Sequence, residues 1–151
     1  MRWDDEDVIT VRPYKGGFRK EKEMRLWVAE NLELLEDGLH IHGDWEAMPE
    51  FPLHLEGEKQ RSGCIDILAV DRKGDFVVIE CKNARAGTIV LGQVLGYMAL
   101  VCEHYAAGGR VRGMLVVQSA APALLSAIRF VPQVPIMVFE CRERGPMKRL
   151  L

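Results

Sequence analysis

Two acidic residues and one lysine stand at spacings that could do chemistry. Asp66 interrupts the apolar stretch Gly63-Cys64-Ile65-Asp66-Ile67-Leu68, and Glu80-Cys81-Lys82 directly follows Val77-Val78-Ile79. A Gly-bearing turn over residues 71–75 joins the two stretches. A hairpin of this kind can bring two carboxylates and one ammonium together. This trio suits a hard divalent cation and an attacking water, the requirements for hydrolysing a phosphodiester.

The surroundings of Asp66 and Glu80 favour a bound cation. An acid inside an apolar strand is costly to bury without a partner, and two adjacent acids repel each other. Mg²⁺ or Mn²⁺ would relieve both costs, because hard cations prefer carboxylate, carbonyl and water oxygens. The backbone carbonyl of Cys81 could be a further ligand, while its thiol is expected to face the core. The structural alternative is that each acid forms an ion pair, Glu80 with Lys82, since residues two apart on a strand share a face.

Lys82 is the candidate to orient the attacking water and to offset charge developing on the phosphate oxygens. Its structural alternative is a plain counter-ion for Glu80.

Two helical segments offer supporting residues. Gln93 and Tyr97 are four apart, so they share one helix face and could donate hydrogen bonds at the rim of the site. In the first helix, Glu21 falls inside the apolar stripe defined by Met24, which makes it the best acid there to approach the metal. The alternative for Glu21 is a favourable interaction with the helix N-terminus.

The composition limits the classes of protein to which this chain can belong. The 151 residues fit one domain, the 48% apolar content is ample for a core, and the net charge of −2 argues against a uniformly basic nucleic-acid binder. Four widely spaced cysteines and four histidines form no recognisable zinc spacing. We see no signal peptide and no apolar stretch long enough to span a membrane, so we expect a reduced, cytoplasmic location.

The elements that must position these residues follow from periodicity and turn signals. We expect a long loop at 46–61, because the segment contains Pro49, Pro52 and Gly57. The helices are expected at about 20–36, 88–104 and 122–130. The strands are expected at 39–45, 64–70, 76–81, 111–118 and 134–141. The order α-β-β-β-α-β-α-β predicts an α/β fold with a mixed β-sheet flanked by helices.

We divide the chain into an N-terminal lead-in over residues 1–17, a domain over 18–141, and a basic, exposed tail over 142–151. No internal repeat or low-complexity tract interrupts this division.

The segment Gly63 to Asp71, followed by Val77 to Lys82 and then by Gln93 to Tyr97, resembles the PD-(D/E)XK nuclease superfamily. Within it the chain is most similar to the C-terminal nuclease domain of the NucS endonucleases, in the RecB-like branch with a Gln-x-x-x-Tyr helix. The resemblance extends from about Glu21 to Cys141, although the 46–61 loop is longer than the family's usual link. We expect no counterpart of the N-terminal DNA-binding and dimerisation domain of NucS, so the resemblance does not imply a preference for mismatched or branched DNA.

The resemblance implies a restriction-endonuclease-like core that cleaves DNA with Mg²⁺ or Mn²⁺. Asp66 and Glu80 would be metal ligands, Lys82 the catalytic lysine and Glu21 the first-helix acid. Gln93 and Tyr97 would be the accessory helix residues. Further phosphate contacts could come from nearby basic residues, namely Arg19, Arg61, Lys73 and Arg85.

Two other functions stay open at this stage. The same fold could serve as a catalytically inactive module for DNA binding or protein assembly, or the chain could be an unrelated α/β interaction domain with ion-paired acids. A homodimer is also compatible with the sequence, because one small domain offers a small DNA footprint.

Overall fold

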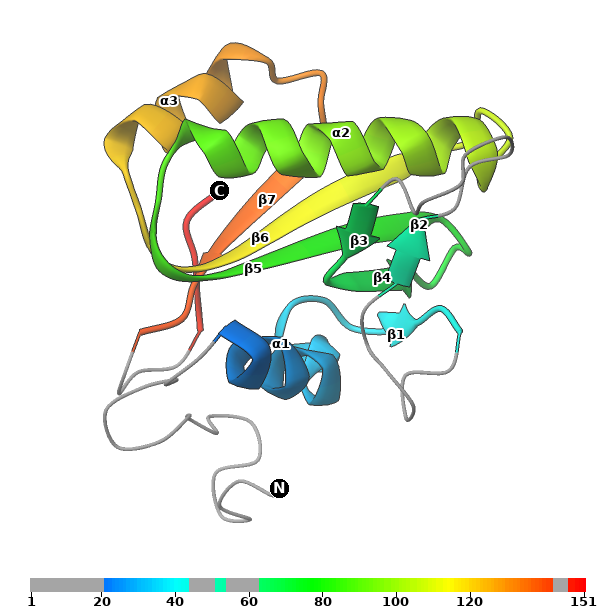
Figure 1. Ribbon diagram of the computed structural model, residues 1–151, viewed down its shortest axis with the longest axis horizontal. Coiled ribbons are helices and arrows are strands. Elements are labelled where there is room, and N and C mark those ends of the chain that lie inside the picture. The colour runs from blue at the N-terminus through cyan, green and yellow to red at the C-terminus, as the bar shows by residue number, and fades with distance from the viewer. Residues whose placement is uncertain (1–20, 44–50, 54–62, 143–146) are drawn as a thin grey trace.

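The computed structural model describes residues 21–43, 51–53, 63–142 and 147–151. Figure 1 shows three layers, with a central sheet between helix α1 on one face and helices α2 and α3 on the other. The main sheet has six strands in the order β1-β4-β5-β6-β7-β8, and β2 pairs separately with β3. This is the mixed α/β architecture that the sequence predicts.

Three parallel strands form the centre of the sheet. These are β5 (Phe76–Ala86), β6 (Val111–Ala120) and β7 (Ile136–Glu140). β4 (Ile67–Val70) runs antiparallel to β5, and β1 (His40–Ile41) runs antiparallel to β4. The apolar run Val77-Val78-Ile79 is fully buried, as expected for a strand covered on both faces. One apolar cluster packs α1 on the sheet, and a second packs α2 and α3 on the other face.

The helices agree with the sequence pattern except at the end of the first. α2 (Thr88–His104) and α3 (Pro122–Phe130) match their expected ranges. α1 (Glu21–Glu30) ends earlier than expected and continues as a short 3₁₀ helix, η2 (Leu32–Leu34). The buried Asn31 side chain donates its Nδ2 hydrogen to the carbonyl of Trp27 at 2.8 Å, which competes with regular helix geometry.

The expectation for residues 46–70 is wrong in two places. The expected loop contains a strand, β2 (Phe51–Leu53), which pairs antiparallel with β3 (Gly63–Ile65). The single strand expected over 64–70 is two strands, because the chain bends at Asp66 between β3 and β4. Local sequence did not reveal β2, because the strand contains Pro52, a residue that argues against a strand, and it is identified only by its pairing with β3.

The C-terminal residues described by the structure include a strand of the sheet, which the sequence analysis did not expect, although the basic side chains of this segment are exposed as expected. β8 (Lys148–Arg149) pairs antiparallel with β7, and the part-buried Leu150 and Leu151 pack against the cluster beneath α2 and α3. In the described part of the chain, no helix has the length and apolar character needed to cross a membrane.

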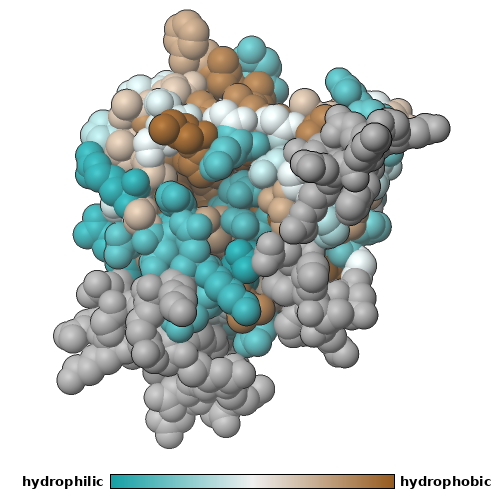
Figure 2. Space-filling model, viewed as in Figure 1, coloured by the Kyte–Doolittle hydropathy of each residue, from teal (hydrophilic) through white to brown (hydrophobic). Residues whose placement is uncertain are grey.

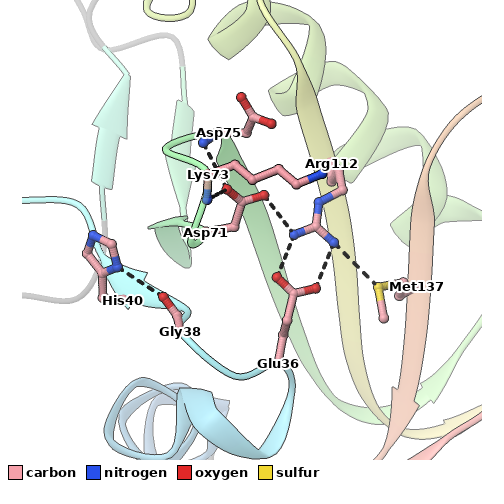
Figure 3. Close-up of polar contacts among 8 residues, drawn as sticks. All are labelled: Glu36, Gly38, His40, Asp71, Lys73, Asp75, Arg112 and Met137. Carbon is pink, nitrogen blue, oxygen red and sulfur yellow. Dashed lines mark hydrogen bonds and ion pairs between the residues drawn. The ribbon is translucent and has the colours of Figure 1, made fainter.

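A partly buried arginine fixes the β4–β5 hairpin to the segment after α1 (Figure 3). Arg112 on β6 donates to both carboxylate oxygens of Glu36, at 2.9 and 2.7 Å, and to Asp71 Oδ2 at 3.0 Å. The other oxygen of Asp71 accepts the backbone N–H groups of Lys73 and Asp75, both at 2.9 Å. We call Glu36, Asp71 and Arg112 the Arg112 clamp. It holds the turn that sets the register between β4 and β5.

Candidate active site

The bend at Asp66 places two acids against each other. The N–H of Asp66 donates to Glu80 Oε1 at 3.3 Å, and the N–H of Cys81 donates to Asp66 Oδ2 at 2.8 Å. Each carboxylate is therefore held by the backbone of the opposite segment. Because Ile67 pairs with Ile79 in the antiparallel ladder, the register brings Asp66 next to Glu80. The bend then turns the Asp66 side chain toward β5.

Burial perturbs the ionisation of both acids. Glu80 is only 7% exposed, and desolvation together with the negative charge of Asp66 raises its pKa to about 9. Desolvation also raises the pKa of Asp66, although the Cys81 hydrogen bond and the nearby Arg25 charge oppose that rise. Without a cation, the pair therefore retains a proton that isolated carboxylic acids lose below neutral pH.

The convergence of these two carboxylates, together with the raised pKa of Glu80, allows the fit of a metal to be tested. Two adjoining carboxylates with raised pKa values, one buried and one partly buried, fit a hard divalent cation, which would compensate their charge. Among the residues that the structure describes, no three His, Cys, Asp or Glu side chains are grouped to hold a metal ion. Asp66 and Glu80 would thus need backbone oxygens and water to complete the coordination, and the Cys81 carbonyl is the candidate from the sequence. The Cys81 thiol is buried in the core, as expected.

Lys82 lies two residues beyond Glu80, and its observed partner is Glu21 rather than Glu80. The distance from Lys82 Nζ to Glu21 Oε1 is 3.4 Å, and both side chains are about half exposed. Glu21 is also near enough to Asp66 for its negative charge to help raise the pKa of Asp66. The first turn of α1 thus lies next to the carboxylate pair. The sequence analysis expected Glu21 to approach this position.

Arg25 is a site residue that the sequence analysis did not identify. Its Nη1 lies 3.6 Å from Asp66 Oδ1, and its side chain is 13% exposed. Arg25 follows Glu21 by four residues, so the two lie on one side of α1. This spacing could have identified Arg25 from the sequence. A residue one helical turn after Glu21 lies on the same side of the helix, and Glu21 was already expected to approach the site.

Helix α2 contributes Tyr97 but brings no close contact from Gln93. The backbone N–H of Cys64 is hydrogen-bonded to the Tyr97 hydroxyl, and burial, aided by the Glu80 and Asp66 charges, raises the pKa of Tyr97. A Cβ on Gly63 would lie 2.7 Å from Tyr97 Cε1, so glycine permits this close packing. Gln93 is exposed, and the structure gives it no hydrogen bond to a described residue.

The proposed phosphate contacts are separated by the fold. Arg85 is exposed on β5, three residues beyond Lys82. Lys73 is in the β4–β5 turn at the opposite end of β5, so the structure does not bring it to the carboxylates. Arg19 and Arg61 lie outside the described residues.

Comparison with known families agrees with this geometry. Residues 20–129 match the family model described as the Endonuclease NucS C-terminal domain. The chain belongs to this family. The matched stretch contains Asp66, Glu80, Lys82, helix α2 and the strands of the main sheet up to β6. It ends before β7 and β8.

Curated NucS proteins are related to most of this chain. Endonuclease NucS of Thermococcus kodakarensis is 33% identical over 129 residues, which are 85% of this chain and 43% of that protein. Endonuclease NucS 2 of Halobacterium salinarum is 33% identical over 129 residues, which are 85% of this chain and 44% of that protein. The chain thus spans less than half the length of these relatives.

Solved structures support the fold. A repair endonuclease from Pyrococcus abyssi has a TM-score of 0.62 at 24% identity, covering 82% of this chain and 48% of that one. A complex of EndoMS with double-stranded DNA has a TM-score of 0.58 at 27% identity, covering 83% of this chain and 46% of that one.

Proposed function

We propose that this NucS-family domain is a metal-dependent endonuclease that hydrolyses DNA phosphodiester bonds. The observation that carries the proposal is the Asp66–Glu80 pair, in which each carboxylate accepts a backbone N–H from the segment of the other, with Lys82 two residues beyond Glu80. Family membership and the described DNA complex of a structural neighbour support DNA as the substrate.

Each residue has a role that follows from its place. Asp66 and Glu80 would hold Mg²⁺ or Mn²⁺, which when bound supplies a Lewis acid for a phosphate oxygen and lowers the pKa of water. The Lys82 ammonium would orient the attacking water and offset negative charge on the phosphate oxygens. Glu21, 3.4 Å from Lys82 Nζ, would position that ammonium. The Tyr97 hydroxyl, fixed by the Cys64 backbone, would keep the β3 side of the site in place.

Cleavage of a supercoiled plasmid in Mn²⁺ tests the proposal. We expect Asp66→Asn and Lys82→Ala to abolish nicking while the thermal unfolding of both proteins stays cooperative. Lys73→Ala is the matched control for Lys82→Ala, because it removes one exposed ammonium at the far end of the same hairpin. Undiminished nicking by both purified site variants would show that another site, or another protein, does the cutting.

Calorimetric titration with Mn²⁺ tests the metal separately from the reaction. We expect heat from the wild-type protein and none from Asp66→Asn. If wild type and Asp66→Asn give equal heats, the ion binds elsewhere. A bound metal would then not explain why Asp66 and Glu80 lie together. A panel of linear, nicked, single-stranded, flapped and mismatched DNAs would then define the structure cut.

One observation favours a second function. Among the described residues no third acidic, histidine or cysteine side chain completes a metal site, which suits an inactive nuclease-fold module that binds DNA or a protein partner. DNA binding without Mn²⁺ heat and without nicking would select this function. The convergence of Asp66 and Glu80 argues against the unrelated domain with separately paired acids. The homodimer and the cytoplasmic location stay predictions from the sequence.

A further inference from the structure

Strand β8 carries two exposed cations in the same cross-strand rows as the candidate site. Lys82 on β5 pairs in register with Val117, Val117 with Glu140, and Glu140 with Lys148. Neighbouring strands are about 4.8 Å apart, so three spacings place the Lys148 backbone about 14 Å from that of Lys82. The pairing therefore carries β8 to the same end of the sheet as Lys82.

Among the residues that the structure describes, the exposed charge at this end is mainly positive. We call Arg85, Arg142, Lys148 and Arg149 the basic edge, and all four side chains are exposed. Parallel β5, β6 and β7 all finish here, and Figure 2 shows hydrophilic side chains gathered over this left-hand end of the sheet. Two acids in the described part of the chain near this end each have a cation, since Glu140 binds Arg142 Nε at 2.7 Å and Glu21 contacts Lys82.

We infer that the basic edge binds the DNA phosphate backbone on one side of the scissile bond, an inference that rests on the proposed function. Successive phosphates of one strand advance by about 3.4 Å along a duplex, so 14 Å spans about four nucleotides. Arg142, Lys148 and Arg149 lie beyond residue 129, where the match to the family model ends, while Arg85 lies within it. Such contacts fix register on the duplex and carry no sequence information.

The salt dependence of binding measures this surface directly. Each lost phosphate contact lowers the slope of log K against log salt by about 0.9, so Lys148→Ala/Arg149→Ala should lower it by about 2. At about 0.1 M salt each contact contributes a factor of about 8, so the double variant should bind up to roughly 60-fold more weakly. Because these residues act on binding, KM for DNA should rise while kcat at saturating DNA stays unchanged.

Fluorescence anisotropy with a labelled duplex of about 20 base pairs gives the affinities, from about 50 to about 200 mM salt. The whole 151-residue chain is used, and Asp66→Asn in every sample prevents cleavage. The matched control is Lys73→Ala/Arg110→Ala, which removes two exposed charges from a hollow of about 290 Å³ at the opposite end of β5. Lys148→Ala alone keeps the Arg149 Nε hydrogen bond to the Leu151 carbonyl, so it tests one charge without disturbing β8.

The outcomes separate the surface from the reaction. The inference is supported if the alanine variants on β8 lower the slope of log K against log salt. The control and Lys148→Arg/Arg149→Lys should keep the wild-type slope. Wild-type affinity and slope in Lys148→Ala/Arg149→Ala, while the wild-type protein cleaves the duplex in Mn²⁺, would overturn the surface and leave the nuclease intact. If the wild-type protein neither binds nor cuts any DNA, the surface and the proposed function are both wrong.

Discussion

Replacing Glu80 by glutamine should abolish the loss of stability that the metal-free protein undergoes as the pH rises. Burial and the Asp66 charge raise the pKa of Glu80 to about 9, so the folded protein holds a proton that the unfolded chain releases near pH 4.5. The amide of Gln has the shape of a protonated carboxyl. It can accept from the Asp66 N–H, as Glu80 Oε1 does at 3.3 Å, and it can also donate toward the Asp66 carboxylate.

The direction of this pH effect follows from the linkage between proton binding and folding. Between pH 4.5 and 9 the folded state binds more protons than the unfolded state, so the free energy of unfolding falls as pH rises through this window. From 4.5 to pH 7 the loss has a ceiling of about 3 kcal/mol, at about 1.36 kcal/mol for each pH unit. Glu80→Gln abolishes this loss. The variant should therefore unfold about 6 to 12 °C higher than wild type at pH 7 in EDTA, and the difference should shrink toward pH 5.

Urea and thermal unfolding from pH 5 to pH 8 in EDTA measure how the free energy of unfolding depends on pH. Glu33→Gln, which changes an exposed glutamate in the same way, is the matched control. Mn²⁺ should reverse the trend for the wild-type protein, because it binds the ionised pair and stabilises by mass action. Glu80→Gln should gain little from Mn²⁺. The reasoning is wrong if wild-type stability in EDTA rises between pH 5 and pH 8, or if Glu80→Gln destabilises the protein equally at every pH.

Three further results are expected. Arg112→Met should lower the free energy of unfolding by about 3 to 5 kcal/mol, measured in urea, because it leaves two carboxylates of the Arg112 clamp without their cation; Arg112→Lys should recover part of the loss. Gly63→Ala should cost about 1 to 3 kcal/mol through its clash with Tyr97, and the cost should shrink in a Tyr97→Ala background, as a double-mutant cycle would show. In native protein two of the four thiols should resist alkylation, because Cys81 and Cys141 are buried with raised pKa values; rapid labelling of all four would contradict the packing.

Regular elements with strong periodicity were predictable from sequence. α2 and α3 begin and end where the sequence analysis placed them, since Thr88 follows a glycine, Pro122 suits a first helical turn and each helix buries one apolar stripe. The buried run at residues 77–79 identified the central strand. Three consecutive apolar residues in a strand require that both faces of the strand be covered, and this is visible from the local sequence alone. β2, β8 and the break at Asp66 were not predictable, because each depends on pairing with a segment distant in sequence.

The sequence by itself determined which chemistry this domain can hold. Two acids beside apolar runs cannot remain buried without a proton or a cation, whatever the surrounding fold, and the spacing of Asp66, Glu80 and Lys82 restricts them to one hairpin. Only the tertiary structure decided their partners. It gave Arg25 to Asp66 and Glu21 to Lys82, and it brought β8 to the end of the sheet where Lys82 lies. Charge interactions depend on distance through space, and these distances exist only after α1 and the C-terminal strand have packed on the sheet.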